Sequence, residues 1–175
     1  MERLFRQSFR RVMAYCLRRT SESAAHDVVA EVYAVAWRRR RQLPSDEEEA
    51  VLWLLGTARR VLANQARTQS RWARLLLRAA ERTDPPEPPR TESHHLQDGA
   101  DLLAAALARS SAADRELLRL AYWDDLSRQD IAAVLGISVG AVDTRLHRAR
   151  ARLRARLQAA SQHSDRTEEK NHAER

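Results

Sequence analysis

Residues 113–157 read ADRELLRLAYWDDLSRQDIAAVLGISVGAVDTRLHRARARLRARL, and this stretch decides the fold of the C-terminal half. Its apolar residues recur every three or four positions, which predicts three helices. Ser127 opens the second helix and is followed three residues later by Asp130, a spacing that approximates a capping box. Gly136 ends this helix, because glycine readily takes the left-handed conformation found at helix ends. Two short helices joined through such a glycine turn predict a helix-turn-helix.

The third helix begins at Ser138, its predicted N-cap, and has one apolar and one polar face. The apolar face carries Val142, Leu146, Ala149 and Leu153. The other face carries Ala141, Thr144, Arg145 and Arg148. A helix fits the major groove with its first turns toward the bases and its arginines toward phosphates. We therefore expect a DNA-reading helix; an ordinary packing unit with solvated arginines is the alternative.

The composition favours an anionic partner. The chain has 175 residues and a formal net charge of +7. No apolar run approaches the ~20 residues of a spanning helix, and the N-terminus has no signal-peptide core, so we expect no membrane insertion. The single cysteine, Cys16, excludes an internal disulfide framework and suits a reducing cytoplasm, where we expect the protein to act.

The remaining chain is predicted to be helical, because no stretch alternates apolar and polar residues long enough for a strand. Helices are expected over residues 3–19, 24–40, 50–80 and 99–109, which gives an all-α fold. The first helix is expected to bury Phe5, Phe9, Met13 and Cys16. The second is expected to bury Val28, Val29, Val32, Val35 and Ala36, and to expose Asp27 and Glu31. Packing roles are expected for the tryptophans Trp37, Trp53, Trp72 and Trp123.

A polar stripe follows the helix predicted over residues 50–80, at spacings of three and four residues. It consists of Arg60, Asn64, Arg67, Arg71, Arg74 and Arg78, and no acidic residue interrupts residues 50–80. A charge run is often only a solvated face. An unbalanced stripe of one sign repels itself, however, and is better explained by a phosphate backbone.

A change in composition separates two small helical domains. Residues 81–99 include PPEPP at 85–89 and are expected to form a flexible proline-rich linker. The predicted domains are residues 1–80 and 100–157, followed by a disordered tail at 158–175. The histidines are scattered and no phosphate-cradling glycine loop is present, so we expect no catalytic site, no cofactor and no metal.

The residues of both halves resemble the extracytoplasmic-function sigma factors. In the C-terminal half the resemblance lies in DRELLRL (114–120), YW (122–123), LS (126–127), DIA (130–132), LGISVG (135–140) and RLHRAR (145–150), which are similar to region 4 of that family. In the N-terminal half HDVVAEVY (26–33), AWR (36–38), WLLGTARR (53–60) and LAN (62–64) resemble region 2. The sequence departs from the family pattern at Ala30, Gly56, Arg60 and Asp143.

The resemblance implies a non-catalytic, promoter-specificity subunit of bacterial RNA polymerase that binds the core enzyme through its beta and beta-prime subunits. It implies core contacts at Asp27 and Glu31, with Trp37 anchoring that helix to its neighbours. The loop at 44–49 is expected to hold a flipped minus-10 base, near Arg60, Asn64, Arg67 and Arg71. The helix from Ser138 is expected to read the minus-35 element through Ala141, Thr144, Arg145 and Arg148. An anti-sigma factor is an expected partner.

Two other classes of protein stay open at this point. A free-standing regulator could bind duplex DNA through the same helix-turn-helix. Such a protein, however, has no need for the polar stripe on the helix predicted over residues 50–80. A polymerase-binding adaptor without promoter function is disfavoured by the basic recognition helix.

Overall fold

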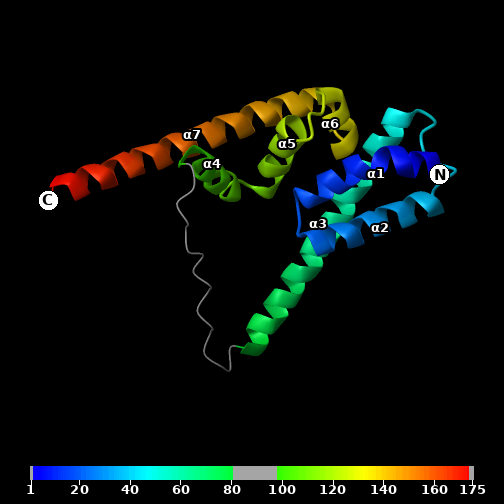
Figure 1. Cartoon of the computed structure of the whole chain (residues 1–175), viewed down its shortest axis with the longest axis horizontal. Coiled ribbons are helices and arrows are strands. Elements are labelled where there is room, and N and C mark those ends of the chain that lie inside the picture. Colours follow the sequence, from blue (N-terminus) through cyan, green and yellow to red (C-terminus); the bar gives the residue numbers. More distant parts are fainter. Residues whose placement is uncertain (1, 81–97, 174–175) are drawn as a thin grey trace. The chain divides into compact units, whose positions relative to one another are not determined.

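The computed structural model describes residues 2–80 and 98–173, and every regular element within them is a helix. The all-α prediction is thereby confirmed. The helices are α1 (Glu2–Leu17), α2 (Glu22–Arg38), α3 (Glu47–Ala80), α4 (Asp98–Ala108), α5 (Ala112–Tyr122), α6 (Arg128–Leu135) and α7 (Val139–Ala173) (Figure 1). Most of the predicted linker, residues 81–97, lies outside the described residues.

The chain forms two compact units, the first of which contains α1, α2 and α3. These three helices pack on one another pairwise (Figure 1). Of the residues predicted for the α2 core, Val28, Val29, Val32 and Ala36 are buried and Val35 is half-buried, whereas Asp27 and Glu31 are exposed. The apolar period of α2 therefore identifies its core face correctly.

The buried face of α1 differs from the predicted one. It consists of Ser8, Val12, Tyr15 and Cys16, whereas Phe5 is 43% exposed and its ring contacts Phe9 and Tyr33, with centroids 5.1 and 4.7 Å away. Ser8 can be buried because its hydroxyl donates to the Leu4 carbonyl and lies 2.7 Å from the Tyr33 hydroxyl. The phenylalanines consequently lie at the edge of the bundle.

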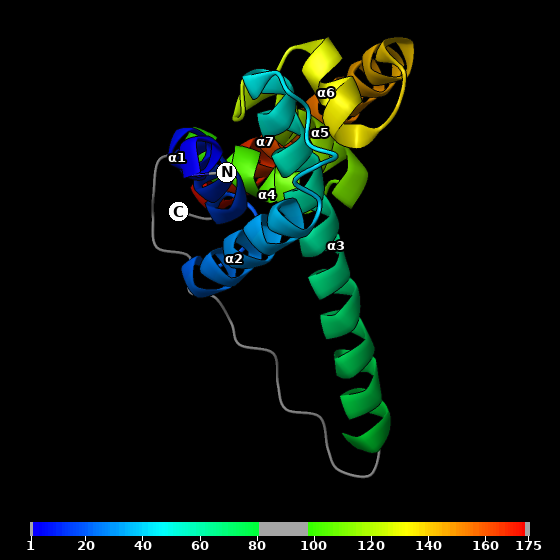
Figure 2. The same cartoon turned by 90° about the vertical axis from the view of Figure 1, so that its right-hand side faces the viewer.

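Three of the four tryptophans do not have the predicted packing role. Trp37, Trp72 and Trp123 are 59%, 62% and 45% exposed, and only Trp53 is half-buried. Trp72 is exposed because α3 is longer than its neighbours, so that its C-terminal half extends past α1 and α2 (Figure 2).

In the second unit α7 packs against α4 and α5. Leu117, Leu118 and Leu120 of α5 and Leu146 of α7 are buried. The helix α7 continues to Ala173, which differs from the disorder predicted from residue 158. Residues 158–173 contain no glycine or proline, so a helix already formed can propagate through them.

Candidate nucleic-acid interface

The turn between α6 and α7 is fixed by capping at both ends of α6. The Ser127 hydroxyl accepts from the Asp130 amide at 3.2 Å, and the Asp130 carboxylate accepts from the Ser127 amide at 3.1 Å. This is the predicted capping box. At the other end Gly136 takes φ 66° and ψ 41°, the left-handed conformation, and the Ile137 amide donates to the Ala132 carbonyl at 3.1 Å. The predicted helix-turn-helix is therefore present.

The helix α7 presents the predicted polar face to solvent. Ser138 caps it, because its hydroxyl accepts from the Ala141 amide at 3.2 Å. Thr144, Arg145 and Arg148 are exposed, and Ala141 is half-buried. The opposite face is buried, with Val142, Leu146 and Ala149 at most 2% exposed. All five residues predicted for the minus-35 element therefore lie at the start or along the first turns of one helix, and four of them are exposed.

Asp143 is the one acidic side chain in the first two turns of α7, and it is neutralised locally. It forms an ion pair with Arg128 of α6, in which both side chains are 51% exposed. An unpaired carboxylate at this position would repel a phosphate. The pair therefore leaves the arginines of this face as the dominant charges.

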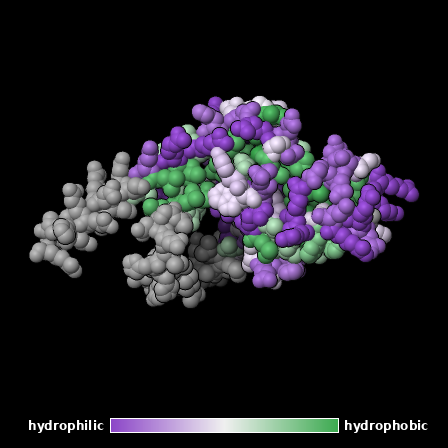
Figure 3. Space-filling model, turned by 45° about the horizontal axis from the view of Figure 1, so that its top comes forward, coloured by the Kyte–Doolittle hydropathy of each residue, from purple (hydrophilic) through white to green (hydrophobic). Residues whose placement is uncertain are grey.

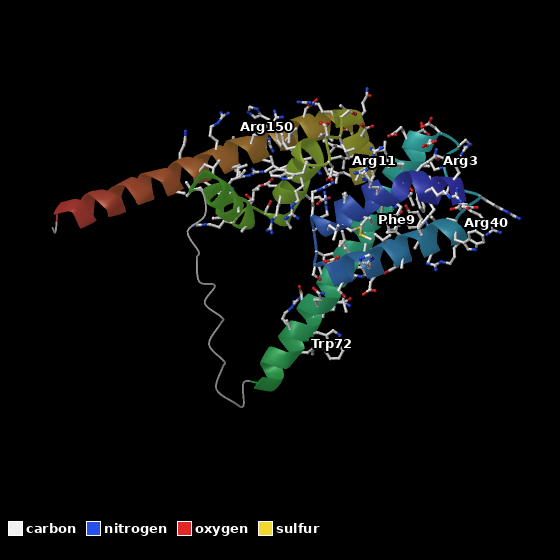
Figure 4. The ribbon with its side chains drawn as sticks, viewed as in Figure 1. Arg3, Phe9, Arg11, Arg40, Trp72 and Arg150 are labelled. Carbon is white, nitrogen blue, oxygen red and sulfur yellow. The ribbon has the colours of Figure 1, made fainter. Side chains whose placement is uncertain are left out.

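A second ion pair holds α7 against α5. Arg152 bonds the carboxylate of Asp114 through two nitrogens, at 2.7 and 2.9 Å. The hydrogen bonds from Arg152 lower the pKa of Asp114 below its usual value, against the opposing effect of burial. Arg150 lies over the Tyr122 ring at 5.3 Å (Figure 4 labels Arg150). Sequence periodicity missed both contacts, because it does not reveal which residues meet across two helices.

The stripe on α3 is exposed as far as its side chains are described. Arg60, Asn64, Arg67, Arg71 and Arg74 are all accessible, and the side chain of Arg78 lies outside the described residues. Arg60 donates to the Thr57 hydroxyl at 3.3 Å, and Arg74 donates to the Ser70 carbonyl at 3.2 Å. On the face drawn in Figure 3, hydrophilic side chains cover much of the surface, with apolar side chains in smaller patches between them.

The loop before α3 is held by hydrogen bonds where it joins that helix. Asp46 caps α3 by accepting from the Glu49 amide at 2.9 Å, and Glu48 bonds Arg11 of α1 at 2.7 Å. These contacts fix where the loop joins the bundle. Its predicted role with a flipped base stays a prediction.

The helix predicted to meet the polymerase core presents Asp27, Glu31 and Trp37 to solvent. The expected anchoring role of Trp37 is wrong, because its ring is 59% exposed and has the Arg40 guanidinium 5.5 Å from its centroid. Trp37 belongs to the surface, where it is available to a partner.

Among the residues with described positions, no three His, Cys, Asp or Glu side chains gather closely enough to hold a metal ion. Burial raises the pKa of the Cys16 thiol to about 11, with Arg19 opposing the shift, so this cysteine is not an activated nucleophile. None of the described helices combines the length and apolar character needed to cross a membrane.

Comparison with known proteins gives the chain a family. Residues 101–153 match the family Sigma-70, region 4. The ECF RNA polymerase sigma factor SigL of Mycobacterium tuberculosis is 32% identical over 145 residues, which cover 82% of this chain and 81% of that protein. The RNA polymerase sigma factor CnrH of Cupriavidus metallidurans is 29% identical over 154 residues, covering 81% and 77%.

Solved structures show the same fold. CnrH in complex with the cytosolic domain of CnrY has 26% identity and a TM-score of 0.59, covering 90% of this chain and 87% of that chain. The sigma factor RpoE from Bartonella quintana, in complex with the anti-sigma factor NepR, has 24% identity and a TM-score of 0.57, covering 90% and 96%. With the helix-turn-helix, the exposed basic helices and these relatives together, the chain belongs to the extracytoplasmic-function (ECF) family of RNA polymerase sigma factors.

Proposed function

We propose that this sigma factor binds the core RNA polymerase and directs initiation at promoters whose minus-35 and minus-10 elements it recognises. The observation that carries the proposal is the polar face of α7. Arg145 and Arg148 project from a helix whose start is capped by Ser138. The one acidic residue in its first two turns, Asp143, is paired. This arrangement suits a recognition helix in the major groove.

The residues assigned to the minus-35 element can make different kinds of contact with DNA. Arg145 and Arg148 have the forked donors that suit guanine edges or phosphates, whereas Ala141 permits close approach of the backbone. The Thr144 hydroxyl donates to the Gly140 carbonyl at 3.0 Å, so its oxygen remains able to accept a bond from a base.

For the minus-10 element we assign the stripe on α3. Arg60, Asn64, Arg67 and Arg71 are exposed along one side of the helix, and they are well placed to track a strand backbone. Asp27, Glu31 and Trp37, all exposed on α2, are assigned to the beta-prime subunit of the core. Trp37 is suited to such a contact, because tryptophan is enriched among the residues that dominate interfaces.

Control by an anti-sigma factor is part of the proposal. It is supported by two solved structures of similar fold: RpoE is in complex with the anti-sigma factor NepR, and CnrH is in complex with the cytosolic domain of CnrY. A protein that covered α2 or the face of α7 would block the contacts assigned above.

Single substitutions on α7 test the minus-35 assignment. Arg145→Ala and Arg148→Ala are each expected to cost about 1–3 kcal/mol in binding a minus-35 duplex, measured by fluorescence anisotropy with the holoenzyme. Arg154→Ala is the matched control, because Arg154 is exposed but lies about 180° around the helix from Arg145. Equal losses in all three variants would indicate nonspecific attraction and would contradict the assignment.

A further inference from the structure

The C-terminal half of α3 exposes an apolar surface that the fold does not use. Trp72 is 62% exposed and Leu75, three residues later, is 56% exposed. Trp72 follows the buried Val61 by eleven residues, about three turns, so both lie on the same side of the helix. In the N-terminal half that side packs on α1 and α2, whereas Trp72 lies on the part of α3 that extends past them (Figures 2 and 4).

Arginines border this apolar surface. Arg67, Arg71 and Arg74 are exposed, and Arg71 is one helical turn before Leu75. No acidic residue occurs from residue 50 to residue 80. Among the side chains that the structure describes, Arg67 and Arg71 form no ion pair. A partner for this surface must therefore be anionic and must also have apolar faces for Trp72.

A single strand of nucleic acid has both properties. Its phosphates supply the negative charge, and its unpaired bases supply flat apolar faces that stack on aromatic side chains. Duplex DNA presents the same charge, but its base faces are already stacked. The position of Trp72 also agrees with a single strand of DNA. Trp72 lies about 12 Å along the helix axis from Asn64, at ~1.5 Å per residue, and Asn64 belongs to the stripe assigned to the minus-10 element.

We propose that Trp72 stacks on an unpaired base of the opened promoter, while Arg67 and Arg71 bind the adjoining phosphates. This inference rests on the proposed function of α3 and adds an aromatic contact to it, at the residue that directly follows Arg71. Stacking does not depend on base identity, because every base has a π-face. Trp72 therefore holds the opened strand and contributes little to the choice of sequence.

The test uses the holoenzyme, formed from the full chain and core polymerase, and two fluorescein-labelled promoter fragments. One fragment is fully duplex and the other has a pre-opened bubble at the minus-10 element. Trp72→Ala is expected to weaken binding to the bubble fragment by about 5- to 150-fold, the range for loss of one stacking contact. Its affinity for the duplex fragment and for core polymerase is expected to stay within about twofold of the unmodified protein.

Two further substitutions of Trp72 identify the kind of contact. Trp72→Phe keeps an aromatic face and is expected to restore most of the affinity for the bubble, whereas Trp72→Leu keeps only apolar area and is expected to resemble Trp72→Ala. Gln69→Ala is the matched control, because Gln69 is exposed on the same part of α3. It is expected to bind as the unmodified protein does.

Each other outcome overturns the inference. Unchanged bubble binding by Trp72→Ala would show that no base stacks there. Equal losses on duplex and bubble would indicate a backbone contact, and rescue by Trp72→Leu would indicate an apolar contact with a protein. Failure of the unmodified protein to bind core polymerase and promoters would instead reject the proposed function, which keeps the two failures distinguishable.

Discussion

Arg152 of α7 binds the carboxylate of Asp114 of α5 through two hydrogen bonds, from Nη2 to Oδ1 at 2.7 Å and from Nε to Oδ2 at 2.9 Å. The Asp114 side chain is 12% exposed, so water competes weakly for its oxygens. Bidentate pairs of this kind add geometric specificity to charge. The contact joins residues 38 positions apart and fixes the direction in which the recognition helix leaves the helix-turn-helix.

Replacing this carboxylate should loosen the second unit. Asp114→Asn is expected to lower the free energy of unfolding by about 1–2 kcal/mol, because a charged double hydrogen bond is lost, although the arginine retains access to water. Urea denaturation followed by circular dichroism measures the loss, and hydrogen exchange should locate it in α5 and α7. Asp143→Asn is the control, since that exposed pair is expected to contribute less than about 1 kcal/mol. Equal losses would contradict a special role for Asp114.

The same pair predicts how stability depends on pH. Arg152 lowers the pKa of Asp114 in the folded protein, whereas in the unfolded chain aspartate titrates near ~3.9. The unfolded state therefore binds the proton first, so the stabilisation is complete above that pH and is lost as the pH falls through the folded pKa. Unfolding free energies measured from pH 6 downward should fall more steeply for the unmodified protein than for Asp114→Asn. If the unfolding free energies of the two proteins fell in parallel as the pH was lowered, the lowered pKa of Asp114 would be contradicted.

Cys16 should be unreactive in the folded protein. Burial raises the pKa of its thiol to about 11, and its side chain is fully buried. At pH 8 only about 0.1% would be thiolate, the form that reacts. A chromogenic disulfide reagent is expected to label the native protein very slowly and the denatured protein at once. Since Cys16 is the only cysteine, one equivalent is expected, and rapid native labelling would refute the burial.

The two glycines of the helix-turn-helix should respond in opposite ways to alanine. An added Cβ meets no atom within 4 Å at either position, but Gly136 has φ 66° and Gly140 lies in α7 without a positive φ. Gly136→Ala is therefore expected to destabilise by about 1 kcal/mol through backbone strain, whereas Gly140→Ala is expected to stabilise by up to about 1 kcal/mol. Thermal unfolding measures both. A loss of stability in Gly140→Ala would be inconsistent with this geometry.

Gly140→Ala should also separate folding from binding. If the α7 backbone closely approaches duplex DNA near Gly140, the added methyl group weakens minus-35 binding even though the fold is stabilised. Anisotropy with the minus-35 duplex would show this as a lower affinity. Unchanged affinity would place the close approach elsewhere on α7.

The sequence predicts the helix-turn-helix well because its determinants are local. Ser127 and Asp130 are three residues apart, Gly136 supplies the left-handed turn, and Val142 and Leu146 repeat at one helical turn. Each of these features acts within one or two turns of helix. The exposed stripe on α3 was predictable for the same reason.

Contacts between distant residues could not be predicted in this way. Ser8 is buried because it meets Tyr33, 25 residues away, and this displaces Phe5 to the edge of the bundle. The exposure of Trp37 and Trp72 depends on where neighbouring helices end, which periodicity does not encode. The arginines around Trp72, unopposed by acids, were the one indication in the sequence that this tryptophan does not pack inside.

The most direct test of promoter-specific initiation combines the purified chain with core RNA polymerase, followed by run-off transcription on a pool of promoter fragments. A sigma factor should form a stable complex and start new transcription only on a subset of fragments that share minus-35 and minus-10 sequences. Binding to duplex DNA without association with core polymerase would contradict this function and would identify a free-standing regulator instead.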